Sequence, residues 1–147
     1  MGAMEQEYLE IAKRYTKEEL QTFAELLAIF VQIAETAPFS DVFGKTYEEI
    51  VGRSKSSAMG QFFTPEGICD VTAQIIIPEN AGYYKSVNDP ACGSGRLLLS
   101  AAKRLNPFQA RTWRYYGTDK DQMCVNMSII NMVLHQLPCQ ILWGNTL

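Results

Sequence analysis

The sequence of 147 residues contains little that would support metal, disulfide or membrane chemistry. It has one histidine and four cysteines, and no two of these cysteines form a C-x-x-C pair. A zinc site and a disulfide framework are therefore both disfavoured. The longest apolar run is too short to span a bilayer, and the N-terminus has no signal-peptide core. These absences predict a cytoplasmic protein with no membrane partner.

Positive charge is also scarce. The chain has 13 Lys and Arg residues against 16 Asp and Glu, a net charge of −3 and a pI near 5.2. Non-specific affinity for nucleic acid comes mostly from basic patches, so strong binding of DNA by this chain on its own is disfavoured. A short basic stretch at Arg53 and Lys55 fits either a solvated loop or a phosphate contact.

The N-terminal part of the sequence predicts helices. Thr16 and Glu19 have the spacing of a capping box, and apolar residues then recur at helical spacing over residues 20–34, before Pro38. A second helix is expected from Ser40, and a third between Pro65 and Pro78. We assign residues 1–60 to an N-terminal helical segment.

Alternating strands and helices are expected after this segment. The strands are predicted near 84–88, 113–117 and 139–143, and the helices at 95–105 and 121–136. The buried face of the last helix is predicted to carry Met123, Met127, Ile130 and Leu134. Such a series implies an α/β fold with three parallel strands and right-handed crossovers, an incomplete Rossmann-like sheet over residues 61–147. The edge of its first strand should be open, and we expect another chain, the N-terminal helices or a C-terminal half of the fold to cover it.

Residues 89–95 read Asp-Pro-Ala-Cys-Gly-Ser-Gly, between the first predicted strand and its helix. Glycine lets a backbone approach a ligand closely, and a helix N-terminus attracts an anion, so this loop can hold a nucleotide-like cofactor. It can equally be a tight connection. Asp119 ends the second predicted strand, where a carboxylate can accept hydrogen bonds from both ribose hydroxyls. The alternative for Asp119 is a cap on the next helix.

Four short motifs in this order resemble a known family. They are residues 60–66, 89–95, 116–119 and 144–147. Together they are similar to the adenine-specific DNA amino-methyltransferases, especially the methylation subunit of type I restriction-modification systems. The resemblance runs from about Val42 to Leu147. It implies a Rossmann-like S-adenosylmethionine-dependent methyltransferase fold, with N-terminal helices before it.

The resemblance also implies roles for individual residues. Phe63 and Thr64 would lie at the amino-acid end of S-adenosylmethionine, and Thr64 is also expected to cap a helix that starts at Pro65. Asp119 would hold the ribose, with Lys120 at the edge of the adenine. The full set of implied cofactor-binding residues is Phe63, Thr64, Asp89, Ala91, Gly93, Gly95, Asp119, Lys120 and Asn145.

Two features depart from the family pattern. Asn145 stands where the family usually has aspartate, so it keeps an acceptor for the adenine amine but loses the charge-assisted part of that hydrogen bond. The family's catalytic motif, Asn or Asp followed by two prolines and an aromatic residue, does not occur in these 147 residues. We therefore name no catalytic residue and no metal ligand.

The sequence thus supports two functions. The first is the cofactor-binding part of a DNA adenine N6-methyltransferase, inactive by itself, which would act on DNA in a complete enzyme and could have a partner subunit or a second copy. The second is a truncated, non-catalytic module that binds the cofactor or a partner. A dinucleotide-dependent oxidoreductase is disfavoured, because Leu98 occupies the place of the third glycine of its fingerprint.

Overall fold

The computed structural model of the chain describes residues 3–51 and 63–147. It divides into two compact units, Met1–Ile33 and Ala34–Leu147. The domain boundary predicted after residue 60 lies within residues 52–62, outside the described residues. Among the helices that are described, none is both long and apolar enough to cross a membrane.

Two helices, α1 (Ala3–Ala12) and α2 (Lys17–Thr36), come first in the chain. The capping box predicted before α2 is confirmed, because the Thr16 N–H donates to Glu19 Oε2 at 2.8 Å and the Glu19 N–H donates to Thr16 Oγ1 at 3.2 Å. These reciprocal bonds satisfy two N–H groups that have no partner within the helix. The helix ends before Pro38, as expected from the loss of a backbone donor there.

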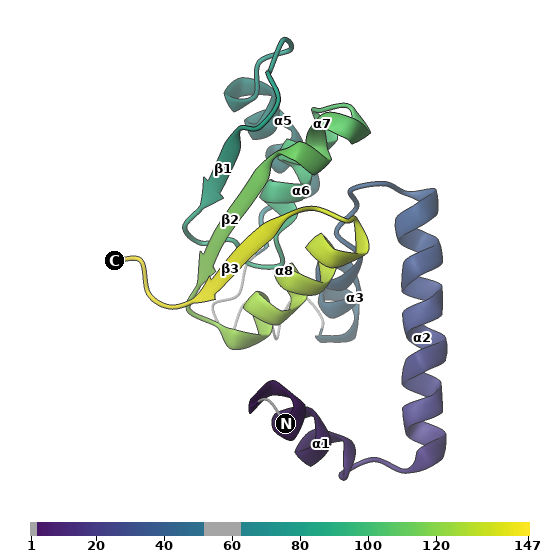
Figure 1. The fold of residues 1–147 in the computed structure, drawn as a ribbon. Helices are drawn as coiled ribbons and strands as arrows, with labels where there is room; N and C mark the ends of the chain where they lie inside the picture. The colour runs from purple at the N-terminus through teal and green to yellow at the C-terminus, as the bar shows by residue number, and fades with distance from the viewer. Residues whose placement is uncertain (1–2, 52–62) are drawn as a thin grey trace. The chain divides into compact units, whose positions relative to one another are not determined.

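The second unit is an α/β structure with a single parallel sheet (Figure 1). Its strands are in the order β1-β2-β3. The elements, in chain order, are α3 (Val42–Val51), α5 (Glu66–Ile76), β1 (Ser86–Asp89), α6 (Arg96–Lys103), α7 (Pro107–Thr112), β2 (Arg114–Asp119), α8 (Gln122–Leu134) and β3 (Cys139–Trp143). The predicted incomplete Rossmann-like sheet of three parallel strands is confirmed. Because all three strands run the same way, their carboxyl ends meet at one edge of the sheet.

Only one face of this sheet is covered by the described residues. Val87 and Tyr115, which are register partners, point toward the packed helices, and Tyr115 is fully buried. Their neighbours on the other face, Asn88, Tyr116 and Gln140, also pair across the strands but are exposed. This alternation follows from the period of two in a β-strand. Parallel sheets are usually covered on both faces, so the bare face is unusual.

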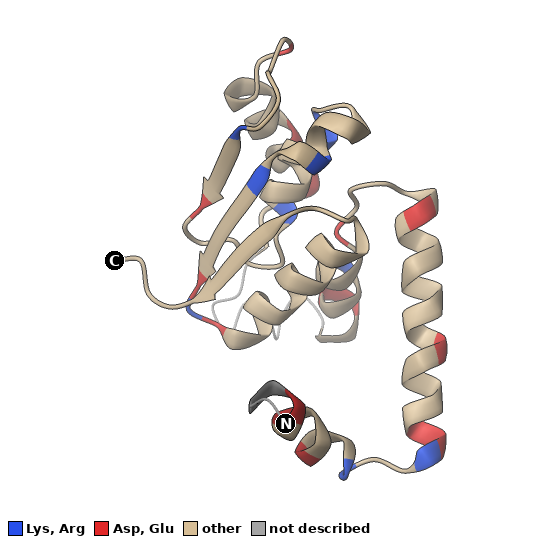
Figure 2. Cartoon of the chain, viewed as in Figure 1, with Lys and Arg blue, Asp and Glu red and all other residues tan. Residues whose placement is uncertain are grey.

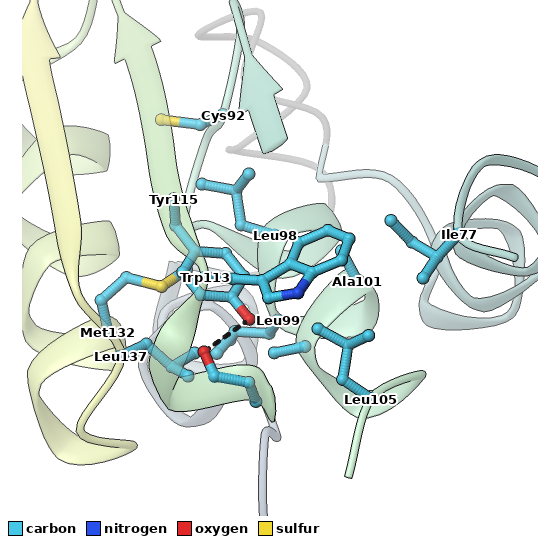
Figure 3. Packing of buried hydrophobic residues seen from close by; sticks show 12 residues of the cluster. Ile77, Cys92, Leu98, Leu99, Ala101, Leu105, Trp113, Tyr115, Met132 and Leu137 are labelled. Atoms are coloured by element: carbon cyan, nitrogen blue, oxygen red, sulfur yellow. Dashed lines mark hydrogen bonds between the residues drawn. The ribbon is translucent and has the colours of Figure 1, made fainter. Parts of the chain in front are cut away.

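The core lies between the sheet and helices α6 and α8 (Figure 3). Leu98 and Leu99 of α6 and Met132 of α8 are almost completely buried against Tyr115. The hydroxyl of Tyr115 donates to the carbonyl oxygen of Ala110 at 3.1 Å, which satisfies the only polar atom of this buried side chain. Burial in these apolar surroundings raises the pKa of Tyr115 well above its ordinary value.

The predicted buried face of α8 is only partly correct. Met127 is buried, but Met123 and Ile130 are exposed. The helix buries Ser128 and Asn131 instead, because polar groups of the second unit bond to Asn131. A prediction that follows apolar residues alone therefore identifies only part of the buried face of this helix.

Helix α7 is not among the helices predicted from the sequence, because a proline that follows a helix usually marks its end. Asn106 instead caps a new helix: its side chain accepts from the Gln109 N–H at 2.9 Å, and Gln109 bonds back to the Asn106 N–H. Pro107 occupies the first helical position, where a missing N–H has no cost.

His135, the one histidine, links the end of α8 to the segment before α3. Its Nδ1 accepts from the Phe39 N–H at 3.2 Å, and its Nε2 lies 2.8 Å from the Ser40 carbonyl oxygen. The first contact requires a lone pair on Nδ1, so the neutral ring with its proton on Nε2 satisfies both groups. Burial lowers the pKa of His135, although the Ser40 carbonyl and the charge of Asp41 oppose this effect.

This arrangement predicts a loss of stability in weak acid. A histidine in the unfolded chain has a pKa of about 6.5 and binds a proton below it, whereas the folded pKa is lower. Just below pH 6.5 the unfolded state therefore binds more protons than the folded state. The free energy of unfolding should decrease as the pH is lowered, by up to about 1.4 kcal/mol per pH unit. Urea unfolding at pH 7.0 and 5.5 measures this change. His135→Gln provides the comparison, and an equal pH dependence in both proteins would contradict the assignment.

Candidate cofactor site

The loop after β1 is fixed to the end of β2 by hydrogen bonds from two backbone N–H groups of the loop. The Cys92 N–H donates to the Thr118 carbonyl oxygen at 3.0 Å, and the Gly93 N–H donates to Asp119 Oδ2 at 2.8 Å. The second carboxylate oxygen of Asp119 accepts from the Asp121 N–H at 2.9 Å. Each oxygen has two acceptor sites, so Asp119 can still accept bonds from a ligand.

Asp119 is not the cap of α8. That position belongs to Asp121, whose side chain accepts from the Met123 N–H at 2.7 Å and the Cys124 N–H at 3.3 Å. The cap alternative considered for Asp119 is therefore wrong. Asp119 shapes the loop between the strand ends instead.

Both glycines of the loop have backbone angles that favour glycine. Gly93 has φ +54° and Gly95 has φ +85°. A Cβ atom on Gly93 would lie 3.1 Å from the Phe63 ring, so this glycine also lets residue 63 approach the loop. Gly95 precedes α6 and lines no described cavity; its backbone packs against Ser128 of α8.

A cavity of about 380 Å³ lies at the carboxyl ends of the strands. Four of the predicted residues line it: Ala91, Asp119, Lys120 and Asn145. Its other walls are Pro90 and residues 144, 146 and 147, and the Thr146 hydroxyl donates to the Pro90 carbonyl oxygen at 2.9 Å. Predicted residues of the second, third and fourth motifs therefore meet at one place.

A smaller cavity of about 120 Å³ shares Ala91 with the first as a lining residue. Phe63, Thr64, Asp89 and Gly93 line it, so the remaining predicted residues apart from Gly95 meet there. Residues 60–62 of the first motif lie outside the described residues. The predicted cap by Thr64 is wrong: α5 begins at Glu66 with Pro65 as its cap, and no side chain caps it.

Acidic residues end both β1 and β2 (Figure 2). Burial raises the pKa of Asp89, and the charge of Asp119 adds to this, while the hydrogen bond from the Ala91 N–H opposes it. Burial raises the pKa of Cys92 to about 11, which makes this thiol a poor nucleophile at neutral pH. No group of three or more metal-ligating side chains is found among the described residues.

The sequence interpretation missed a buried polar cluster behind the loop, formed by Asp41, Ser94, Arg96 and Asn131. The Arg96 Nε–H donates to Asp41 Oδ2 at 2.7 Å, and the Ser94 hydroxyl donates to the same oxygen at 2.6 Å. One signal was available for Arg96. A cation in the first turn of a helix opposes the helix dipole, which indicates a compensating anion nearby.

The sequence matches the family of N-6 DNA methylases over residues 39–147. The chain belongs to this family. The match includes the loop, both strand ends and the buried cluster behind them. The predicted relationship to adenine N6 methyltransferases of restriction-modification systems is confirmed.

Two relatives are methylase subunits of type I restriction enzymes. The MpnII subunit of Mycoplasma pneumoniae is 34% identical over 100 residues, which are 66% of this chain and 18% of that protein. The EcoEI subunit of Escherichia coli is 31% identical over 117 residues, 72% of this chain and 23% of that protein. The chain thus spans about a fifth of the length of these methylase subunits.

The structure of a modification subunit of a putative type I restriction enzyme from Vibrio vulnificus has the same fold. It superposes with a TM-score of 0.51 over 89% of this chain and 25% of that one, at 19% identity. This likeness supports the fold alone.

Two glycine substitutions, one in the loop and one in α5, should affect the stability of the protein differently. Gly95→Ala should destabilise the protein by at least about 1–2 kcal/mol, because φ is positive and the new Cβ would lie 2.7 Å from Ser128 Oγ. Gly67→Ala in α5 meets no atom within 4 Å and should be neutral or stabilising by up to about 1 kcal/mol. Urea denaturation measures both. Equal stability of the two variants would show that the loop conformation is not required.

Proposed function

We propose that the chain is the S-adenosylmethionine-binding part of a DNA adenine N6-methyltransferase of the restriction-modification type. The observation that carries this proposal is the meeting of the glycine loop, the Asp119 carboxylate and residues 144–147 around the 380 Å³ cavity, in a member of the N-6 DNA methylase family. A site of this volume is within the usual range for small-molecule pockets.

The residues of the larger cavity suit the adenosine portion of the cofactor. Asp119 keeps free acceptor sites toward the cavity, and ribose hydroxyls are donors that such a carboxylate binds. Asn145 can accept a hydrogen bond from the adenine amine, and Lys120 lies beside it on the cavity wall.

The smaller cavity suits the amino-acid portion. The Phe63 ring contacts Gly93 and supplies an apolar wall, and Asp89 offers a carboxylate toward a cationic amine. When bound, S-adenosylmethionine supplies a methyl group on a sulfonium. The role we propose for these residues is to bind and orient the cofactor, which contributes to rate by proximity.

The substrate and the catalytic motif belong to the complete enzyme. We propose that DNA adenine is the methyl acceptor there, and that the 147 residues alone do not methylate it. A non-catalytic module that holds the cofactor or a partner remains the second candidate, favoured by the absence of an Asn-Pro-Pro-aromatic sequence from these residues. Cofactor binding by this chain tests whether the site is functional. A DNA methylation assay on a complete protein that contains this sequence then distinguishes the enzyme from the module.

Removal of the Asp119 charge should weaken cofactor binding. Asp119→Asn keeps the size of the side chain but replaces one acceptor oxygen with a donor, and hydrogen bonds to charged groups contribute about 1.5–3 kcal/mol. We expect a loss of about 10- to 100-fold in affinity for S-adenosylmethionine, measured by titration calorimetry. Asp121→Asn is the matched control, because asparagine caps a helix as well as aspartate and residue 121 lies outside the cavity. Unchanged affinity in Asp119→Asn would reject the ribose assignment.

We also propose that the free edge of β1 is a surface where the complete enzyme adds structure. A groove of about 720 Å³ runs along it, with Ile77, Val87 and Trp113 among its lining residues. An unpaired strand edge readily associates with another. The isolated chain should therefore self-associate with increasing concentration in sedimentation velocity. A monomer at every concentration would contradict this prediction.

A further inference from the structure

Arg96, the first residue of α6, joins three segments that are distant in the sequence. Its Nε donates to Asp41 Oδ2 at 2.7 Å, its Nη2 donates to Glu48 Oε2 at 2.9 Å, and its Nη1 donates to the Thr64 carbonyl oxygen at 3.0 Å. Its guanidinium carbon lies 5.5 Å from the centre of the Phe63 ring. The side chain is 8% exposed. One cation therefore connects α3 to Phe63 and Thr64, two of the residues that line the amino-acid end of the proposed cofactor site.

Asp41 supplies the anion for this cation and also contacts the loop. Its Oδ2 accepts from the Ser94 hydroxyl at 2.6 Å as well as from Arg96. Its Oδ1 accepts from the Gly44 N–H at 2.8 Å and from Asn131 Nδ2 at 2.7 Å. The four acceptor sites of a carboxylate are thereby filled, and only 1% of the side chain is exposed.

Ser94 lies between the two glycines of the loop, and both its hydroxyl and its carbonyl oxygen form hydrogen bonds. Its hydroxyl binds Asp41, and its carbonyl oxygen accepts from Asn131 Nδ2 at 2.9 Å. A Cβ atom on Gly44 would overlap the Asp41 carboxylate and lie 2.5 Å from the Ser94 hydroxyl, so α3 lies directly against the loop. The contact between α3 and the loop thus depends on the position of Asp41, which lies outside every cofactor motif.

We propose that Asp41 and Arg96 are positioning residues that fix the conformation of the 89–95 loop and of Phe63 and Thr64 before S-adenosylmethionine binds. This proposal rests on the proposed function. Preorganisation improves affinity, because a site that is already ordered loses little conformational entropy when the ligand binds. Burial disfavours the charge of Arg96, but Glu48 and Asp41 together hold its pKa above the ordinary value. Arg96 is therefore a cation at neutral pH.

The test compares Asp41→Asn with Lys45→Gln in the full 147-residue chain. Asp41→Asn removes the charge with little change in shape. Lys45→Gln removes the cation of a different ion pair, Lys45 to Glu66 at 2.7 Å, in which Asp41, Arg96 and the loop take no part. Two quantities are measured in each: amide hydrogen exchange by NMR in the ligand-free protein, and affinity for S-adenosylmethionine by calorimetry.

Asp41→Asn should speed exchange of the Gly93 and Gly95 amides at least tenfold and weaken cofactor affinity at least tenfold. The Tyr115 amide, which donates to the Pro138 carbonyl oxygen in the sheet, should exchange at the unmodified rate, since a local effect leaves the sheet intact. Lys45→Gln should change all of these values less than twofold. If Asp41→Asn does not fold, Ser94→Ala removes only the hydroxyl bond and should give the same changes to a smaller extent.

The two possible failures have different signatures. If the unmodified chain binds S-adenosylmethionine and Asp41→Asn binds it equally, with unchanged exchange at Gly93 and Gly95, the positioning role is overturned and the proposed function stands. If the unmodified chain does not bind the cofactor, the proposed function is overturned. Faster exchange across Gly93, Gly95 and Tyr115 alike would also overturn the positioning role, because it would show that the pair supports only the global fold.

Discussion

The parallel alignment of the three strands is the constraint on which the site depends. Because β1 and β2 run in the same direction and are in register from Ser86 to Asp89, the loop after one strand lies beside the acid that ends the other. The Gly93 N–H then reaches the Asp119 carboxylate at 2.8 Å. An antiparallel arrangement would place these two residues at opposite edges. The chemistry available at the site therefore follows from strand direction first and from side chains second.

The glycine loop has support from two directions. On its outer side, the Gly93 N–H donates a hydrogen bond to Asp119. On its buried side, Ser94 forms hydrogen bonds with Asp41 and Asn131. Both supports use carboxylates, and their surroundings differ. Asp119 is partly exposed and has acceptor sites left for a ligand, whereas Asp41 is buried with all its sites filled. Only the first is suited to bind; the second is suited to hold geometry.

Local signals predicted much of the fold and the outline of the site. The capping box at Thr16, the β3 strand at 139–143 and the meeting of Asp119 with the loop each follow from nearby residues or from strand order. The buried face of α8 does not follow from nearby residues. It includes Asn131, whose burial depends on Asp41, 90 residues away in the chain. Helix α7 was missed because a proline fits both a stop and a first turn.

The buried residues that the sequence interpretation missed share one physical property. Asp41 and Arg96 are stable in the interior only as partners, and 55 residues separate them. Burying either charge alone would carry a desolvation cost that no neighbour in the sequence offsets. The same reasoning applies to the bare face of the sheet, where Tyr116 and Leu142 are exposed on strands of a type that is normally covered on both faces. In both cases the local sequence shows a residue out of place. The two buried charges find their partners in the folded structure, whereas this face of the sheet is left bare by the described residues.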